Sequence, residues 1–324
     1  MSLVLGIDGG GTNTRCLVVD TKMQVIGVGN SGASKPDAID HATGIKHLHR
    51  AIYDACKECG IDAIDTVFVG MGGVISDTDA NIVRTMLDGL EFKTGIPIGI
   101  DHDIRIALAG GLAGKQGIAL IAGTGSSCYG RTSAGKTWRC GGWGYLIDDL
   151  GSGFYLGQQA LMAVTQAADG RGSATALTKS VIETLGLTDL NQVMNRVYYP
   201  HAAIGAIASL APLVLELSSY DPTAHTIVVN ATKHLANLVI TTAKQLDLQN
   251  EVNVVAVGGV VTSSEPFRQL LEAAIKEQLP TAKLQLPIAP PVVGAAILAF
   301  EQIGQTPSLS DLNHLTETLS PSRL

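Results

Sequence analysis

Two short runs of glycine with threonine, asparagine or serine carry the residue types that bind phosphate. Glycine lets a backbone approach a ligand closely, and successive N–H groups and hydroxyl side chains attract anions. Each run follows a β-rich segment and leads into a second strand. Two such hairpins predict a pair of related domains that hold one anion between them. The phosphate-binding candidates are Gly10, Gly11, Thr12, Asn13 and Thr14 in the first run, and Gly123, Thr124, Gly125 and Ser126 in the second.

Acidic residues stand at the ends of two predicted strands. Phosphoryl transfer to an alcohol needs a metal, donors that hold the phosphates, and a carboxylate that deprotonates the hydroxyl. Asp8 directly precedes the first run and is the candidate for holding Mg²⁺, with a turn-capping role as the alternative. Asp101 and Asp103 both follow the strand 96–100 and are the candidate bases, with a helix cap as the alternative role for Asp101. His102 is expected to support the site through a hydrogen bond.

Two other phosphate-binding motifs are excluded by their context. The first glycine run lacks the Gly-x-Gly-x-x-Gly spacing and opens a strand, so a dinucleotide-binding fold is not expected. Residues 130–137 match the P-loop pattern Gly-x4-Gly-Lys-Thr. A P-loop must lead into a helix, whereas three glycines follow within residues 138–144 and would not sustain one. We therefore predict a surface hairpin at 130–137.

The composition describes a globular protein with room for two domains. The chain has 324 residues, of which 46% are hydrophobic and 16% charged. A net charge of −7, with no basic run, argues against nucleic-acid binding. The apolar stretch 202–217 is interrupted and too short to span a membrane, and no export signal begins the chain, so we expect a cytoplasmic protein. Five cysteines fit reduced thiols, with Cys56 and Cys59 packed in a core.

Strand-like and helix-like segments are mixed along the chain, which predicts the α/β class. The tail, 308–319, places four leucines on one stripe and is expected to dock on the body or on a second subunit. A homodimer is left open for that reason. The predicted helices cover residues 45–59, 80–87, 152–168, 174–185, 224–246, 266–278 and 292–303.

An ordered set of motifs resembles the N-acetylglucosamine kinases of the BadF/BadG/BcrA/BcrD ATPase family, within the actin-like ATPase and sugar-kinase superfamily. The set covers nearly the whole chain. The resemblance implies two ribonuclease-H-like domains with an interdomain cleft: residues 1–109 plus a returning segment 292–324, and residues 110–291 with helical insertions. The motifs are residues 8–15, 123–126, 141–144 followed by Asp149, and 255–260.

The resemblance also implies roles for individual residues. The family's Asn-Asp-Ala motif corresponds to His102, Asp103 and Ile104 here, which makes Asp103 the catalytic base and a sugar contact. Asp8 matches the family's magnesium-binding aspartate. The remaining implied contacts are Thr124, Gly142, Trp143, Gly144 and Asp149 for the sugar, and Gly258 and Gly259 for adenosine.

Two positions keep alternatives open. Trp143 either supports the site by packing or contacts the sugar. The family usually carries an asparagine after its second hairpin, whereas this chain has Lys35 and Asp37 in that segment, and either could replace it.

These features together predict an ATP-dependent kinase that uses Mg²⁺ and phosphorylates the 6-hydroxyl of an amino sugar, most readily N-acetylglucosamine. A glucosamine kinase or a broad-specificity hexokinase is the alternative within the same class. An ATPase activator of an acyl-CoA dehydratase or reductase shares the fold but needs cysteine ligands for an iron–sulfur cluster. A sugar sensor without catalytic activity is the third class.

Overall fold

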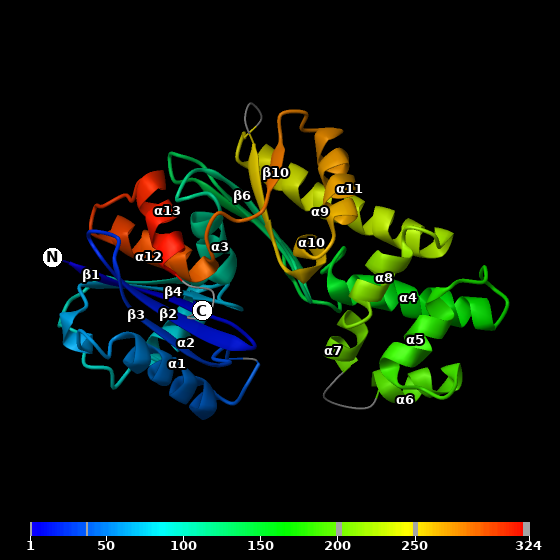
Figure 1. Cartoon of the computed structure of the whole chain (residues 1–324), viewed down its shortest axis with the longest axis horizontal. Coiled ribbons are helices and arrows are strands. Elements are labelled where there is room, and N and C mark those ends of the chain that lie inside the picture. The colour runs from blue at the N-terminus through cyan, green and yellow to red at the C-terminus, as the bar shows by residue number, and fades with distance from the viewer. Residues whose placement is uncertain (1, 37, 199–202, 249–251, 320–324) are drawn as a thin grey trace. The chain divides into compact units, whose positions relative to one another are not determined.

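A computed structural model describes residues 2–36, 38–198, 203–248 and 252–319 (Figure 1). The chain divides into two compact units. Unit 1 comprises Met1–Gln116 and Pro287–Leu324, and unit 2 comprises Gly117–Leu286. The expected boundaries at 109/110 and 291/292 fall inside two helices, α3 (Asp103–Gly111) and α12 (Pro291–Gln302), which both lie in unit 1.

Unit 1 is built on a mixed sheet of five strands, in the order β3-β2-β1-β4-β5. The pairs β1-β2 and β2-β3 are antiparallel, whereas β4 and β5 run parallel to β1. Parallel pairing brings the carboxyl ends of β1, β4 and β5 to one edge of the sheet. The strands are β1 (Leu3–Gly9), β2 (Asn13–Asp20), β3 (Val25–Gly32), β4 (Thr66–Met71) and β5 (Ile98–His102).

Helices cover both faces of this sheet, and a separate hydrophobic cluster fills each interface. One face carries α1 (His41–Ala55) and α2 (Asp77–Thr85), and the other α3, α12 and α13 (Leu309–Thr318), with a short 3₁₀ turn at Ile61–Ala63 (Figure 1).

Helix α1 begins earlier and ends earlier than the sequence pattern predicts. Asp40 caps it by accepting a hydrogen bond from Thr43 N, and the helix stops at Ala55. Cys56 and Cys59 therefore lie in the turn that follows. Burial raises the pKa of the Cys56 thiol to about 12, so this thiol stays protonated and packs as an apolar group.

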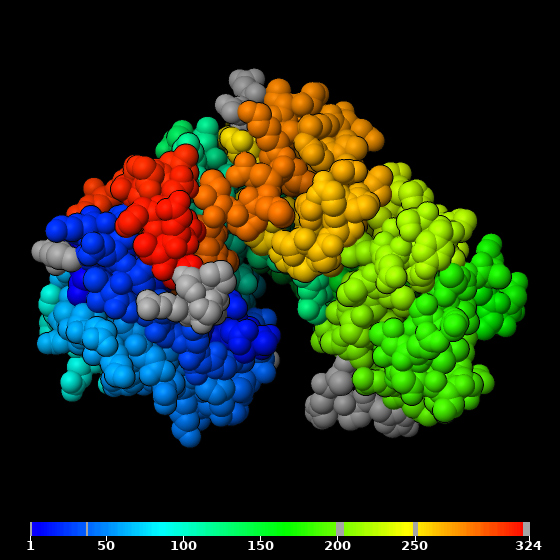
Figure 2. Space-filling model, in the orientation of Figure 1, coloured from blue at the N-terminus to red at the C-terminus, as the bar shows by residue number. Residues whose placement is uncertain are grey.

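The C-terminal tail docks on the body of unit 1. Leu312, Leu315 and Leu319 are buried in the cluster formed with α12. Figure 2 shows the red C-terminal residues lying against the blue N-terminal ones within this unit. Three of the four leucines are thus buried within one chain, whereas Leu309 is 44% exposed; docking on the body was one of the two expected outcomes.

Unit 2 repeats the strand order of unit 1. Its sheet has the order β10-β9-β6-β7-β8, with β6-β7-β8 antiparallel and β9 and β10 parallel to β6. This correspondence confirms the prediction of two related α/β domains, each opening with a glycine-turn hairpin. The strands are β6 (Gly117–Ala122), β7 (Ser126–Arg131), β8 (Thr137–Gly141), β9 (Asn253–Val257) and β10 (Lys283–Gln285).

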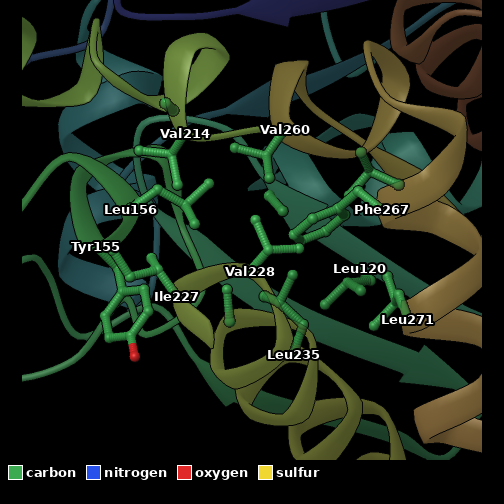
Figure 3. Packing of buried hydrophobic residues seen from close by; sticks show 14 of the residues in the cluster. Leu120, Tyr155, Leu156, Val214, Ile227, Val228, Leu235, Val260, Phe267 and Leu271 are labelled. Atoms are coloured by element: carbon green, nitrogen blue, oxygen red, sulfur yellow. The ribbon is translucent and has the colours of Figure 1, made fainter. Parts of the chain in front are cut away.

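Side chains from β6 and several helices of unit 2 pack into one interior (Figure 3). Leu156, Val214 and Val260 come from three different helices and converge there. Among the described residues, no helix is long and apolar enough to cross a membrane. The helices are α4 (Gly153–Ala168), α5 (Leu177–Leu185), α6 (Val193–Tyr198), α7 (Ala203–Ala208), α8 (Ala211–Leu217), α9 (Pro222–Gln245), α10 (Gly259–Thr262) and α11 (Glu265–Lys276), with a 3₁₀ turn at Leu190–Gln192.

Candidate active site

The first glycine turn joins β1 to β2 and presents exposed polar residues. Gly10 N donates to Asn13 O at 2.9 Å, which closes the turn. Gly11, Thr12 and Asn13 are exposed, as a phosphate contact requires. Thr14 differs, because its side chain is fully buried and hydrogen-bonds with Gly32 O and Ser34 Oγ, each at 2.7 Å. Its hydroxyl fixes the base of the turn.

Asp8 and Asp103 lie close enough for their charges to interact. Asp8 pairs across the hairpin with Arg15, whose Nη1 is 3.9 Å from Asp8 Oδ2. Burial raises the pKa of Asp8 from 3.8 to about 6, the charge of Asp103 adds to the rise, and Arg15 opposes it. A buried carboxylate beside a second carboxylate is destabilised, so the pair favours a bound cation.

Asp101 and His102 both contact Arg105 at the start of helix α3. Asp101 forms an ion pair with Arg105, and the guanidinium of Arg105 also lies 5.3 Å from the centre of the Phe68 ring. His102 Nδ1 accepts from Arg105 N at 3.2 Å and caps the helix. These contacts engage Asp101 and His102, whereas Asp103 is the first residue of α3.

Gly72, at the end of β4, borders Asp103 and was missed as a site residue. A β-carbon on Gly72 would lie 3.3 Å from Asp103 Oδ2 and 3.4 Å from Lys35 Cδ. Beside it is a pocket of about 330 Å³. The sequence signal for Gly72 was that it forms, with Gly73, a second glycine pair at the end of a strand. Asp37, which together with Lys35 was considered as a replacement for the family's asparagine, lies outside the described residues. The pocket is lined by Pro36, Gly72, Gly73, Val74, Asp79, Ile82 and Val83.

The second glycine turn joins β6 to β7 in unit 2 and is tied to the start of α4. Gly123 O accepts from Gly153 N at 2.7 Å, and Thr124 O accepts from Phe154 N at 3.1 Å. Asp149, at a φ of 58°, accepts from Ser126 N at 3.2 Å. The carboxylate predicted to contact sugar thus also positions the turn, and the sequence gave no signal for this second contact.

A pocket of about 430 Å³ lies between this turn and the start of α10. Gly258 has a φ of 98°, and a β-carbon there would lie 2.5 Å from Ala122 O, so the close approach of β9 to β6 requires glycine. A β-carbon on Gly123 or Gly259 would meet no atom within 4 Å. Sequence reasoning missed the wall supplied by α7 and α8. The lining residues are Gly123, Thr124, Gly153, Ala208, Ala211, Pro212, Leu215, Gly259, Val260 and Ser263.

Gly142, Trp143 and Gly144 form part of an exposed loop that follows β8. Trp143 is 64% exposed, and the centre of its ring lies 5.0 Å from the Arg139 guanidinium. The backbone N–H of Trp143 donates to Asp148 Oδ2 at 3.2 Å. The tryptophan is therefore not part of a core, and the guanidinium of Arg139 lies over its ring.

The lysine of the P-loop-like sequence lies in a hairpin, as predicted. Lys136 follows the turn between β7 and β8, where Thr132 N donates to Lys136 O at 2.9 Å. Lys136 Nζ donates to Gln245 O at 2.7 Å. Within the described residues, no group of three or more His, Cys, Asp or Glu side chains could hold a metal ion by itself.

Comparisons with known proteins agree on one family. The BadF/BadG/BcrA/BcrD ATPase family matches residues 5–299. The chain is 30% identical over 312 residues to an N-acetyl-D-glucosamine kinase of Dictyostelium discoideum, covering 92% of this chain and 98% of that protein. It is 30% identical over 281 residues to an N-acetylmuramic acid/N-acetylglucosamine kinase of Clostridium acetobutylicum, covering 84% and 90%.

Solved structures share the fold. A crystal structure of a proposed N-acetylglucosamine kinase from Chromobacterium violaceum has a TM-score of 0.75 at 26% identity and covers 92% of this chain and 99% of that one. A ROK-family glucokinase from Streptomyces griseus, crystallised with glucose and AMPPNP, has a TM-score of 0.57 at 15% identity and covers 93% and 100%. The fold is therefore that of the actin-like ATPases, as the sequence predicted.

Proposed function

Since the chain belongs to the BadF/BadG/BcrA/BcrD ATPase family, we propose that it is an ATP-dependent kinase that phosphorylates the 6-hydroxyl of N-acetylglucosamine or a close amino-sugar relative. The observation that carries this proposal is the pair of interacting carboxylates, Asp8 and Asp103, beside an exposed glycine turn in unit 1. Two full-length relatives named as kinases of this sugar class support it.

The adenosine of ATP is proposed to bind in the unit 2 pocket. The pocket is lined largely by apolar and small residues and is bordered by Gly123 and Gly259, where backbone can come close to a ring or a ribose. The exposed N–H groups and side chains around Gly11, Thr12 and Asn13 are proposed to hold the phosphates. Hydrogen bonds of Gly10, Gly125 and Ser126 hold the shape of the two turns. Gly258 instead allows the close approach of β9 to β6.

Asp8 fits the requirements of a magnesium site. Mg²⁺ usually binds through one or two carboxylates together with waters and substrate phosphates, so a single buried aspartate beside a phosphate turn is sufficient. When bound, the ion would offset charge on the phosphates. Its positive charge would also stabilise the ionised form of Asp8, whose pKa burial raises to about 6.

Asp103 is proposed to orient the sugar hydroxyl and accept its proton. It begins α3 at the sheet edge that also carries Asp8, whereas the neighbouring Asp101 is held by Arg105. Asp149, Trp143 and the flanking Gly142 and Gly144 are proposed to bind the remaining sugar hydroxyls, with Thr124 beside them. Hydrogen bonds to hydroxyls reject analogues that lack them more strongly than an apolar wall does.

The test is an ADP-release assay across N-acetylglucosamine, glucosamine, N-acetylmannosamine and glucose. We expect the highest kcat/KM with N-acetylglucosamine; a preference for glucosamine or glucose would instead support the alternative within the kinase class. Binding of a sugar without any ADP release would support a sensor and contradict the proposal.

A matched pair of variants tests the assignment of the base. Asp103→Asn should lower kcat by about 100-fold or more, because the acceptor of the hydroxyl proton is lost. Asp101→Asn should lower it far less, since Asp101 acts on Arg105. Equal effects from both variants would remove Asp103 from this role.

A further inference from the structure

We propose that Arg139 positions the ring of Trp143 for contact with the sugar. The inference rests on the proposed function, in which Trp143 belongs to the loop that binds the sugar. Arg139 is a positioning residue here, because it acts through the ring and does not touch the reacting groups. The basis of the inference is a cation that a β-strand holds over an exposed aromatic ring.

Arg139 is held in place by the edge strand of the unit 2 sheet. It is the central residue of β8, and its backbone lies opposite Tyr129 of β7 in an antiparallel pair. The Arg139 side chain is half-buried, whereas that of Trp143 is exposed. Within the described residues, the guanidinium forms no ion pair, so a carboxylate does not set its position.

The guanidinium contacts both the ring and the backbone that precedes it. The central carbon of the group lies 5.0 Å from the centre of the Trp143 ring, which is within the range of cation–π attraction. A β-carbon on Gly142 would lie 3.7 Å from Arg139 Nη1 and 2.9 Å from Ser127 Cβ. The strand-held cation therefore lies against the loop at the point where Trp143 leaves it.

The loop itself gives the ring few other restraints. Gly142 and Gly144, on either side of Trp143, have φ values of 77° and 94° and carry no side chain that could pack against the indole. The backbone N–H of Trp143 donates to Asp148 Oδ2, which holds the main chain but not the ring. The orientation of the ring therefore depends on Arg139.

One face of the Trp143 ring stays open while Arg139 covers the other. The side chain is 64% exposed, which a ring covered on both faces could not be. A sugar of the gluco configuration carries its ring substituents equatorially, so its C–H bonds point to the two faces of the sugar ring and can pack against an indole. A ring that is already oriented loses less conformational freedom when the sugar binds, and such preorganisation raises affinity.

The first test is the KM for N-acetylglucosamine in variants of Arg139. Arg139→Met keeps the length of the side chain and removes its charge, so it should raise this KM by about 3- to 10-fold, because binding must then order the ring. It should leave kcat and the KM for ATP unchanged. Arg139→Lys, which keeps the charge, should recover part of the loss. Arg171→Met, at an exposed arginine of unit 2 that pairs with Asp169, is the control and should change none of the three constants.

A double-mutant cycle shows whether Arg139 acts through the ring. In a Trp143→Ala background, Arg139→Met should have no further effect on the KM for the sugar. An equal effect with and without the ring would overturn the inference, because Arg139 would then act on the ligand itself. An unchanged KM for the sugar in Arg139→Met or in Trp143→Ala would also overturn it.

Fluorescence supplies a readout that a merely structural role would not move. The chain has two tryptophans, so Trp138→Phe leaves Trp143 as the single one. Added N-acetylglucosamine should shift the emission of Trp143 to shorter wavelength as the ring is removed from water. With Arg139→Met in the same background, the midpoint of this titration should move to about 3- to 10-fold more sugar. A midpoint that does not move contradicts the inference.

The outcomes separate this inference from the proposed function. ADP release with N-acetylglucosamine that depends on neither Arg139 nor Trp143 overturns the inference alone. A shift in Trp143 emission without ADP release contradicts the proposed kinase activity and supports the ring contact. If the sugar causes neither ADP release nor an emission change, both proposals fail.

Discussion

Replacing Asp8 by Asn should stabilise unit 1 at neutral pH while impairing its activity. Burial, with the charge of Asp103 added, raises the pKa of Asp8 from 3.8 to about 6. One pKa unit corresponds to about 1.4 kcal/mol, so keeping Asp8 ionised in the folded protein costs about 3 kcal/mol. Because the folded-state pKa lies above the unfolded one, this cost is small at pH 4, grows as the pH rises to about 6, and is constant above it.

Asp8→Asn removes the charge and keeps the shape of the side chain. We expect its free energy of unfolding to exceed that of the wild type by up to about 3 kcal/mol at pH 8 and by less than about 1 kcal/mol at pH 4. The gain is an upper value, because Arg15 loses a weak partner at 3.9 Å. Such a cost in stability is common at functional sites.

The assay must report on unit 1, and both tryptophans, Trp138 and Trp143, lie in unit 2. Hydrogen exchange of the β1 and β4 amides, without metal or nucleotide, measures the free energy of opening of the unit 1 sheet. Asp103→Asn should give a smaller gain, since it removes only one cause of the raised pKa of Asp8, and the double variant should be less than additive. A gain that does not change with pH, or a loss of stability at pH 8, would refute the reasoning.

The remaining predictions concern activity. Gly72→Ala places a β-carbon 3.3 Å from Asp103 Oδ2 and should lower kcat/KM for the sugar by about 10-fold through displacement of the base, whereas unchanged kinetics would separate Gly72 from the site. Gly259→Ala adds a methyl group in open space beside the unit 2 pocket, so it should fold normally and raise the KM for ATP by about 5-fold or more; Gly258→Ala, which would clash with Ala122 O, should instead reduce thermal stability. Trp143→Ala should change stability by less than about 0.5 kcal/mol because the side chain is largely exposed, so a raised sugar KM in this variant would report a direct contact, and an unchanged KM would argue against one. Activity with Mg²⁺ and ATP should fall as the pH drops below about 6, since a protonated Asp8 cannot hold a cation, and a flat kcat/KM profile down to pH 5 would contradict that role.

The glycine-turn hairpins were predictable because their signals are local. A run of β-branched and apolar residues before Gly9 and before Gly123 indicates a buried strand, and the polar glycine turn marks where it ends. The repeated hairpin accounts for one adjacent antiparallel pair in each sheet, β1-β2 and β6-β7. Helix boundaries were less predictable, since the start of α1 depends on a single cap, Asp40, outside the apolar stripe.

The parts of the site that were missed depend on contacts between distant segments. Gly72 matters only because β4 ends beside β5 and the Lys35 segment, which no local pattern encodes. Asp149 holds Ser126 across 23 positions of sequence. Tryptophan is a residue type that usually packs in a core. Trp143 is nevertheless exposed, because the two glycines with positive φ that flank it turn its side chain outward. Such placements come from tertiary structure and not from residue type.

The most direct test of the proposed reaction is to identify its product by nuclear magnetic resonance. With N-acetylglucosamine, ATP and Mg²⁺, a phosphorus-31 signal coupled to the protons on carbon 6 should appear as ATP is consumed, and it should be nearly absent with Asp103→Asn. Release of inorganic phosphate without a sugar phosphate, or phosphate on another carbon, would contradict the account.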